Sequence, residues 1–129
     1  MTQQAKLQTP RARVSHLGSA KSGTLQAWRM RLTAFALLPL TLAFVIILLS
    51  LAGRDFESAR ALIGSPCPAI LMILFVVAGA WHMMMGMQAI IEDYVHHEHA
   101  KQLALMGNFC FSAVVGLAAV YAVLRISFT

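Results

Sequence analysis

Three long stretches without a charged residue constrain this chain most. They run from about residue 32 to 52, 67 to 91 and 103 to 124, and contain no Asp, Glu, Lys or Arg. A membrane-spanning helix needs roughly 20 apolar residues, and only 12% of the chain is charged, against about 25% in soluble domains. The sequence therefore predicts an all-α membrane protein with a three-transmembrane-helix domain over residues 24–129, preceded by a basic tail, residues 1–23, that we expect to be flexible.

The basic residues predict how the chain lies in the membrane. With the N-terminus inside, seven basic residues fall inside and three outside, as the positive-inside rule prefers. The inside set is Lys6, Arg11, Arg13, Lys21, Arg29, Arg31 and Lys101. We therefore expect a bacterial inner (cytoplasmic) membrane, a cytoplasmic N-terminus, a periplasmic C-terminus and no nucleic-acid partner. The first 54 residues contain no acid, which leaves a mitochondrial inner-membrane protein with a transit peptide as the alternative.

Other residues predict where the helices begin, bend and pack. Pro39 should kink the first span, because it removes a backbone hydrogen bond inside the helix. Ser65 and Pro66 read as an N-cap and first helical residue opening the second span, after a polar connection at residues 53–64 with one turn of surface helix. Small residues in the third span let helices approach closely. Such a thin bundle should need an obligate partner in the membrane and form part of a heterodimeric helical bundle.

His82 lies deep inside the second span, where an unpartnered imidazole is unfavourable and by default marks function. In a helix, Gly86, Ala89 and Asp93 return to nearly the same face. That face carries a metal ligand, a strip of small residues and a carboxylate about 16 Å along the axis. The strip favours a planar macrocycle, and a b-type haem between helices typically needs two axial ligands. The alternative for His82 is an ordinary interhelical hydrogen bond.

Asp93, Tyr94 and Arg31 are further candidates near the ends of spans. Tyr94 can donate a hydrogen bond to a quinone carbonyl beside an acid that relays protons, or simply belong to the interfacial aromatic belt. Arg31 suits a haem propionate or another carboxylate, and equally an interfacial anchor.

Other clusters are weaker signals. Consecutive methionines at residues 83–85 point in different directions round a helix, which favours apolar packing over copper binding. The loop at residues 96–99 holds three histidines but no defined ligand geometry, which favours a solvated, titrating loop over a metal site. Cys67 and Cys110 should pack as small hydrophobes.

The segment HMMMGMQAIIEDYV, from His82 to Val95, resembles the second helix of the small hydrophobic anchor subunit of succinate dehydrogenase, the D-type subunit. That family shows a His, a Gly four residues on, and an Asp-Tyr pair eleven and twelve residues on. The lead-in from Ser22 to Ala34 is also similar, and the resemblance runs from about residue 19 onward. Gln88 and Ala89 depart from the family's pattern.

The resemblance implies a membrane anchor without an active site of its own. His82 would be one axial ligand of haem b, and a C-type cytochrome b anchor subunit would supply the other. Tyr94 would hydrogen-bond ubiquinone, Asp93 would support that site, and Arg31 would lie near the haem propionates. Electrons would arrive from succinate through a flavoprotein subunit and an iron–sulfur subunit. The alternatives are a fumarate reductase anchor and a small membrane interaction or metal-handling protein using the histidine loop.

Overall fold

The computed structural model describes residues 22–128, in which nearly every residue is helical. The helices are α2 (Ser22–Leu51), α3 (Phe56–Gly64), α4 (Pro66–Tyr94) and α5 (Glu98–Phe128). Of the predicted flexible tail, residues 1–21 lie outside the described residues. Helices α2, α4 and α5 are long and apolar enough to cross a membrane, which confirms the all-α prediction of three spans.

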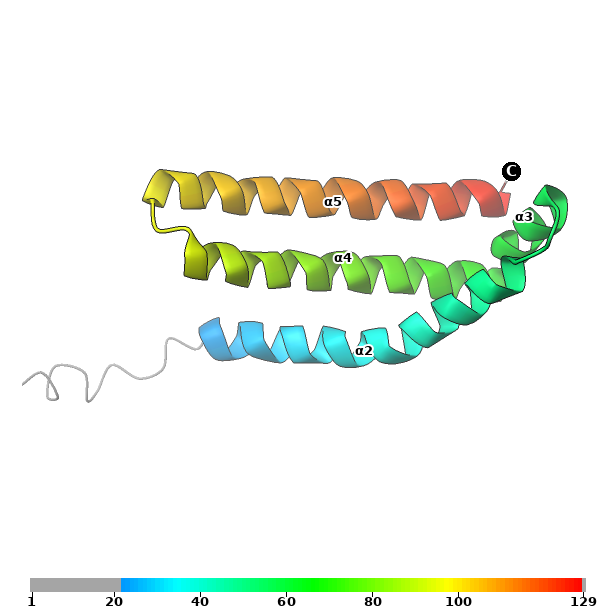
Figure 1. The fold of residues 1–129 in the computed structure, drawn as a ribbon, viewed down its shortest axis with the longest axis horizontal. Coiled ribbons are helices and arrows are strands. Elements are labelled where there is room, and N and C mark those ends of the chain that lie inside the picture. Colours follow the sequence, from blue (N-terminus) through cyan, green and yellow to red (C-terminus); the bar gives the residue numbers. More distant parts are fainter. Residues whose placement is uncertain (1–21, 129) are drawn as a thin grey trace, which may run out of the picture.

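The three long helices form a single layer with α4 in the middle (Figure 1). Helix α4 packs against α2 on one side and α5 on the other. The start of α2 and the α4–α5 connection lie at one end of this layer, and α3 lies with the end of α5 at the other (Figure 1). The N-terminal end of α2 and the connection at residues 95–97 therefore lie at the same end of the layer.

Helix α2 begins ten residues before the predicted apolar span and includes the expected interfacial lead-in. Pro39 lies inside the helix, and α2 bends in its second half (Figure 1), as the missing backbone donor predicts. The part of α2 beyond Pro39 still packs on α4. The ring of Phe44 in α2 stacks on the ring of Phe75 in α4, with centroids 4.5 Å apart. The bend therefore keeps both halves of α2 in contact with the central helix.

Helix α3 has nine residues rather than the single turn expected. Asp55 caps its N-terminus and accepts hydrogen bonds from the Ser58 hydroxyl at 2.5 Å and the Ser58 backbone N–H at 3.4 Å. These bonds lower the pKa of the Asp55 carboxyl. Ser65 and Pro66 open α4 as predicted, but the Ser65 hydroxyl makes no bond to α4. It donates to the Leu62 carbonyl at 2.6 Å, and so closes α3.

Helices α4 and α5 approach each other closely at Gly116. A Cβ atom added at Gly116 would lie 3.3 Å from the Ala80 Cβ, so the predicted role of small residues in the third span is confirmed there. The Asn108 amide donates to the Met84 carbonyl at 2.9 Å. At the connection, the Lys101 ammonium donates to the Glu92 carbonyl at 2.7 Å, where a cation suits the end of a helix.

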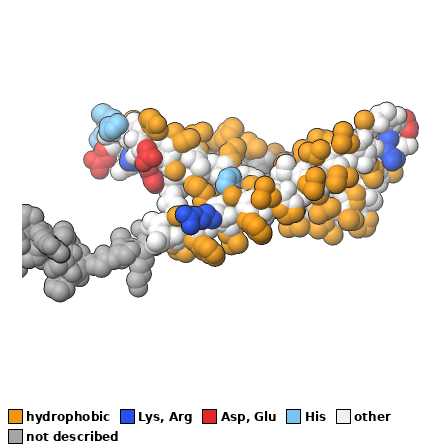
Figure 2. Space-filling model, turned by 60° about the horizontal axis from the view of Figure 1, so that its bottom comes forward, with side chains coloured by type: hydrophobic (Ala, Val, Ile, Leu, Met, Phe, Trp, Pro, Cys, Tyr) orange, Lys and Arg blue, Asp and Glu red, His pale blue; other side chains and the backbone are white. Residues whose placement is uncertain are grey.

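This single layer leaves little interior. The buried hydrophobic residues of the described chain are Ile47, Ala69, Met85, Ile91 and Val123. Figure 2 shows hydrophobic side chains over most of one face, with charged side chains gathered toward the two ends. An apolar surface of this extent needs lipid or another subunit to cover it.

Candidate functional site

His82 lies near the middle of α4, twelve residues before the end of that helix at Tyr94, or about 18 Å along the axis. Its imidazole is half-buried against α2. The Nδ1 atom of His82 lies 2.9 Å from the Oγ1 atom of Thr33. The helical face that carries His82 is thus directed toward α2 at this point.

The surroundings of Thr33 are compatible with a His82 tautomer that can bind a metal. Thr33 Oγ1 also lies 3.0 Å from the Arg29 carbonyl and 3.0 Å from the Met30 carbonyl. The Thr33 hydroxyl can donate to a carbonyl of its own helix and so leave its oxygen lone pairs for His82. In the His82 tautomer that carries its proton on Nδ1, this oxygen accepts from the Nδ1–H group. In this tautomer the Nε2 atom keeps its lone pair, which suits it to bind a metal.

Open space lies beside Gly86, one helical turn from His82 toward Tyr94. A Cβ atom added at Gly86 would meet nothing within 4 Å, whereas one added at Gly79 would lie 4.0 Å from the Leu37 side chain. Helix α2 therefore packs along α4 before His82 and leaves room after it. The predicted strip of small residues therefore borders open space at Gly86.

A cavity of about 290 Å³ separates the first turns of α2 from this part of α4. The polar residues that line it are Gln26, Arg29 and Gln88, and Trp81 is among its apolar residues. Arg29 precedes Thr33 by four residues and so shares its α4-facing side of α2. Arg31 is exposed and lies about 160° round the helix from Thr33. Both arginines are exposed, and it is Arg29, not Arg31, that lines this cavity with Trp81.

Asp93 and Tyr94 end α4, and both are exposed. Tyr94 is 77% exposed and lies about 100° round the helix from Asp93. Asp93 shares the His82 face, as predicted. The structure thus separates two places on α4: His82 within the span, and the Asp93–Tyr94 pair at its end.

The remaining candidates form no site within the described residues. The rings of His97 and His99 have centroids 6.0 Å apart, and within residues 22–128 no three His, Cys, Asp or Glu side chains are placed to hold a metal ion. Met85 is buried while Met83 and Met87 are exposed, so the methionines do point in different directions. Cys67 and Cys110 are free and exposed within the described residues, so their packing as small hydrophobes against lipid or another subunit stays a prediction.

Sequence reasoning missed Thr33 as a neighbour of His82 and Arg29 as a residue of the cavity between α2 and α4. Thr33 and His82 are 49 residues apart, and their meeting depends on how α2 slides along α4. A hydropathy pattern reports which residues are apolar, not the register of two spans. Because Arg29 precedes Thr33 by about one helical turn, the two residues share a side of α2. Once Thr33 is known to face α4, this repeat puts Arg29 on the α4 side as well.

Comparison with known proteins agrees with this arrangement. Residues 5–120 match the family described as the succinate dehydrogenase/fumarate reductase transmembrane subunit. The chain belongs to this family. Over 117 residues it is 37% identical to the succinate dehydrogenase hydrophobic membrane anchor subunit of Paracoccus denitrificans, covering 91% of this chain and 90% of that one. The subunit of the same name from Rickettsia bellii (strain RML369-C) is 27% identical over 111 residues, covering 86% and 89%. No solved structure matches.

The family and the three apolar helices together make the chain a multi-pass membrane anchor subunit. An anchor subunit of succinate dehydrogenase or fumarate reductase serves an oxidoreductase complex whose catalytic subunits are separate chains. The resemblance read from the His82–Val95 segment is thereby confirmed at the level of the family.

Proposed function

We propose that this chain anchors a succinate:ubiquinone oxidoreductase, respiratory complex II, supplies one axial ligand of haem b and forms part of the ubiquinone site. His82 is the haem ligand, and a C-type cytochrome b anchor subunit supplies the second. The iron–sulfur and flavoprotein subunits deliver the electrons of succinate. The observation that carries this proposal is the Thr33–His82 contact of 2.9 Å at Nδ1, because it leaves Nε2 free to bind iron.

The residues round His82 fit a haem. The open space beside Gly86 and the small side chain of Ala89 admit a flat macrocycle next to the imidazole. Arg29, which lines the cavity between α2 and α4, offers a guanidinium group to a propionate, whereas Arg31, the residue expected in that role, lies on the other side of α2. Bound there, haem b would supply a site that takes up and releases one electron at a time.

The end of α4 fits a quinone site. Reduction of ubiquinone to ubiquinol consumes two electrons and two protons, so its carbonyls must be within reach of water. Tyr94 has the exposure required and can donate a hydrogen bond to one carbonyl oxygen. Asp93, adjacent in sequence, can pass protons from the aqueous side. This end of α4 faces the cytoplasm if the basic residues set the orientation.

The same residues would serve a fumarate reductase, in which quinol gives up electrons. His82 favours a haem-containing anchor of either kind. Succinate oxidation is preferred here because the two relatives above are both named as succinate dehydrogenase subunits. Measuring succinate-driven and quinol-driven turnover on one preparation separates the two directions.

Two variants of the whole complex, purified through a tag on this chain, test the proposal. His82→Ala should lose the low-spin haem spectrum while the subunits still co-purify. Tyr94→Phe should keep the haem and lower ubiquinone reduction roughly 10- to 100-fold, the cost of a hydrogen bond to a group that gains charge. The two effects are separable because the residues lie about 18 Å apart on α4.

The histidines of the α4–α5 connection provide the matched control. Replacing His96, His97 and His99 by alanine should leave the haem spectrum and turnover unchanged. If His82→Ala keeps an unaltered haem, the ligand assignment is wrong. If only the triple variant impairs the protein, the metal-handling alternative replaces the anchor-site proposal.

A further inference from the structure

A groove between α4 and α5, here called the methionine groove, lies on the part of α4 that leads to Tyr94. It encloses about 290 Å³ and extends about 12 Å along the axis of α4. Its lining residues are Met83, Met87 and Ile91 of α4 and Ala104, Gly107, Asn108 and Phe111 of α5. The polar residue among them is Asn108, whose amide already donates to the Met84 carbonyl at 2.9 Å. None of these residues has a role in the proposed haem or quinone contacts.

The methionine groove and Tyr94 share one stripe of α4. Met83, Met87 and Tyr94 are separated by four and seven residues, so all three lie within about 40° round the helix. Side chains of a helix tilt toward its N-terminus, which from Tyr94 is the direction of Met87. His82 lies at least about 100° from each of them. A molecule that contacts Tyr94 can therefore continue into the groove without passing the His82 face.

The methionine groove offers what a thin hydrocarbon chain needs. Met83, Met87 and Phe111 are exposed and Ile91 is buried, so the groove is open on one side and has an apolar base. A Cβ atom added at Gly107 would meet nothing within 4 Å, so no side chain fills the α5 wall there. Methionine side chains are unbranched and adapt to irregular partners. A ligand here should be apolar, since a polar group would lose its hydrogen bonds.

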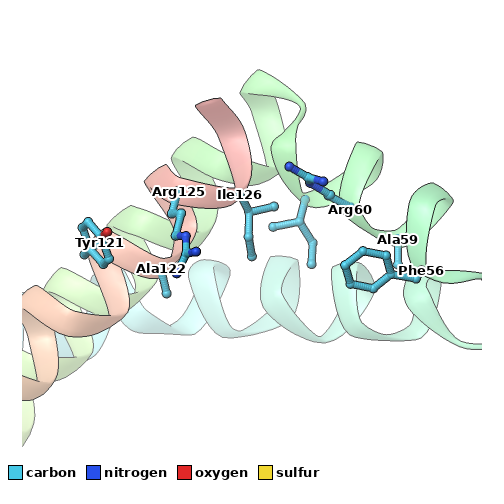
Figure 3. A pocket seen from close by; sticks show the side chains of 8 residues that line it. Phe56, Ala59, Arg60, Tyr121, Ala122, Arg125 and Ile126 are labelled. Carbon is cyan, nitrogen blue, oxygen red and sulfur yellow. The ribbon is translucent and has the colours of Figure 1, made fainter. Parts of the chain in front are cut away.

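A wider hollow at the other end of the layer does not suit the same role. It lies between α3 and the last turns of α5 (Figure 3), encloses about 630 Å³ and has Arg60 and Arg125 among its lining residues. The connection at residues 95–97, which follows Tyr94, lies at the opposite end from α3 (Figure 1). The part of a chain nearest to a ring at Tyr94 cannot reach that hollow, because the 29 residues of α4 extend about 45 Å.

We propose that the methionine groove holds the polyprenyl tail of the quinone whose ring binds at Tyr94. This path rests on the proposed quinone site, to which it adds the direction of the tail. The first isoprene units lie along Met87 and Met83, opposite Gly107 and Phe111. Surrounding lipid is as apolar as the groove, so burial itself adds little affinity. The groove acts instead by limiting where the tail can leave the ring, which favours one orientation of the carbonyl that Tyr94 contacts.

Steady-state kinetics of the intact complex, purified in mild detergent, test this path with two quinones. One is a ubiquinone with two isoprene units, and the other is the same ring without a tail. Gly107→Leu puts a branched side chain into the groove. The ratio of kcat/KM for the tailed quinone to kcat/KM for the tail-free ring should therefore fall about tenfold, within the range that overpacking costs. Because the ring chemistry is common to both quinones, this ratio reports the tail.

Ala113→Leu is the matched control, because it adds the same side chain to the same helix but in a different groove, beside Trp81. It should keep the wild-type ratio. Met83→Ala/Met87→Ala removes most of the α4 wall instead of filling the groove, and should also lower the ratio. This pair of substitutions remains informative if the Gly107→Leu complex does not assemble.

Tyr94→Phe separates failure of the tail path from failure of the proposed function. It should lower turnover of both quinones alike, because Tyr94 contacts the ring. If it does so while Gly107→Leu and Ala113→Leu give the same ratio, the tail lies elsewhere and the quinone site stands. Normal turnover of both quinones by Tyr94→Phe would show instead that the ring contact is wrong. Loss of another subunit from both groove variants would make the groove a contact between subunits and overturn the tail path.

Discussion

At the scale of single residues, one hydroxyl group decides what His82 can do. When the Thr33 hydroxyl donates to a carbonyl of its own helix, it presents an oxygen lone pair to Nδ1 of His82, and Nε2 keeps the lone pair that a metal needs. If the hydroxyl instead donated to His82, the proton would sit on Nε2 and the nitrogen directed away from Thr33 would be a poor ligand. The residue most informative about His82 is thus on another helix.

The first prediction follows from this contact. Thr33→Val keeps the branched shape but removes the acceptor, so the Nδ1–H group of His82 loses its partner and the ring its fixed orientation. Loss of such a partner typically costs 10- to 100-fold in metal affinity. Haem should therefore dissociate about tenfold or more faster from the Thr33→Val complex, measured by transfer to an apo-haem acceptor protein.

Thr33→Ser restores the oxygen and should restore the wild-type rate of haem transfer. A second readout, the reduced-minus-oxidised haem spectrum, should remain low-spin in Thr33→Val, because His82 itself is unchanged. Identical haem transfer from the Val and Ser variants would mean that Thr33 does not position His82.

How far the sequence predicts this site differs from residue to residue. The repeat of the helix is a local property, so it correctly puts Asp93 on the His82 face. The contact with Thr33 and the position of Arg29 depend on the register of two helices, which no local pattern contains. Arg31 illustrates the difference: it lies close to Thr33 in sequence but on the other side of α2.

At the scale of helices, the predicted spans are shorter than the observed ones for a physical reason. Apolar composition marks the hydrocarbon core of about 30 Å, but a bilayer with its headgroups is about 40–45 Å thick. Helices α2, α4 and α5 have 30, 29 and 31 residues, or about 45 Å each. The helical backbone satisfies its own hydrogen bonds in both regions, so the helices continue where the side chains become polar.

The packing of α4 on α5 gives the second prediction. Gly116→Ala places a methyl group 3.3 Å from the Ala80 Cβ, and both atoms are fixed to helix backbones, so the helices must move apart. Overpacking of this kind costs about 1–3 kcal/mol. The variant complex should lose its anchor subunits at a lower temperature than the wild type, measured by thermal challenge and size-exclusion chromatography.

Gly107→Ala is the control on the same helix. A Cβ atom there would meet nothing within 4 Å in this chain, while alanine favours a helix over glycine by about 1 kcal/mol. It should be neutral or slightly stabilising. If both variants behave alike, the close approach at Gly116 does not limit how α4 and α5 pack.

At the scale of the whole molecule, the single layer of helices accounts for the need for partners. Large apolar residues such as Leu38, Leu49 and Phe111 are exposed on it, and no second layer covers them within residues 22–128. A bilayer and further subunits supply that cover in an anchor. The sequence predicts this from composition, whereas the order of the helices, with α4 in the centre, comes only from the structure.

The arrangement of the ends gives the last prediction. The start of α2 and the α4–α5 connection lie at one end of the layer, and α3 lies at the other end (Figure 1). The sequence alone assigns seven basic residues to the N-terminus and the α4–α5 connection and three to the other end of the chain's spans, so we expect the first end to be cytoplasmic. In a background with Cys67 and Cys110 replaced by serine, a membrane-impermeant thiol reagent should label Ala61→Cys, in α3, on intact spheroplasts. It should label His97→Cys only after lysis, with labelling in denaturing detergent as the control that both thiols react.

The reverse pattern would put Tyr94 on the periplasmic side, away from the cytoplasmic protons that the proposed quinone chemistry uses. Labelling of both positions from one side would contradict the three-span arrangement itself.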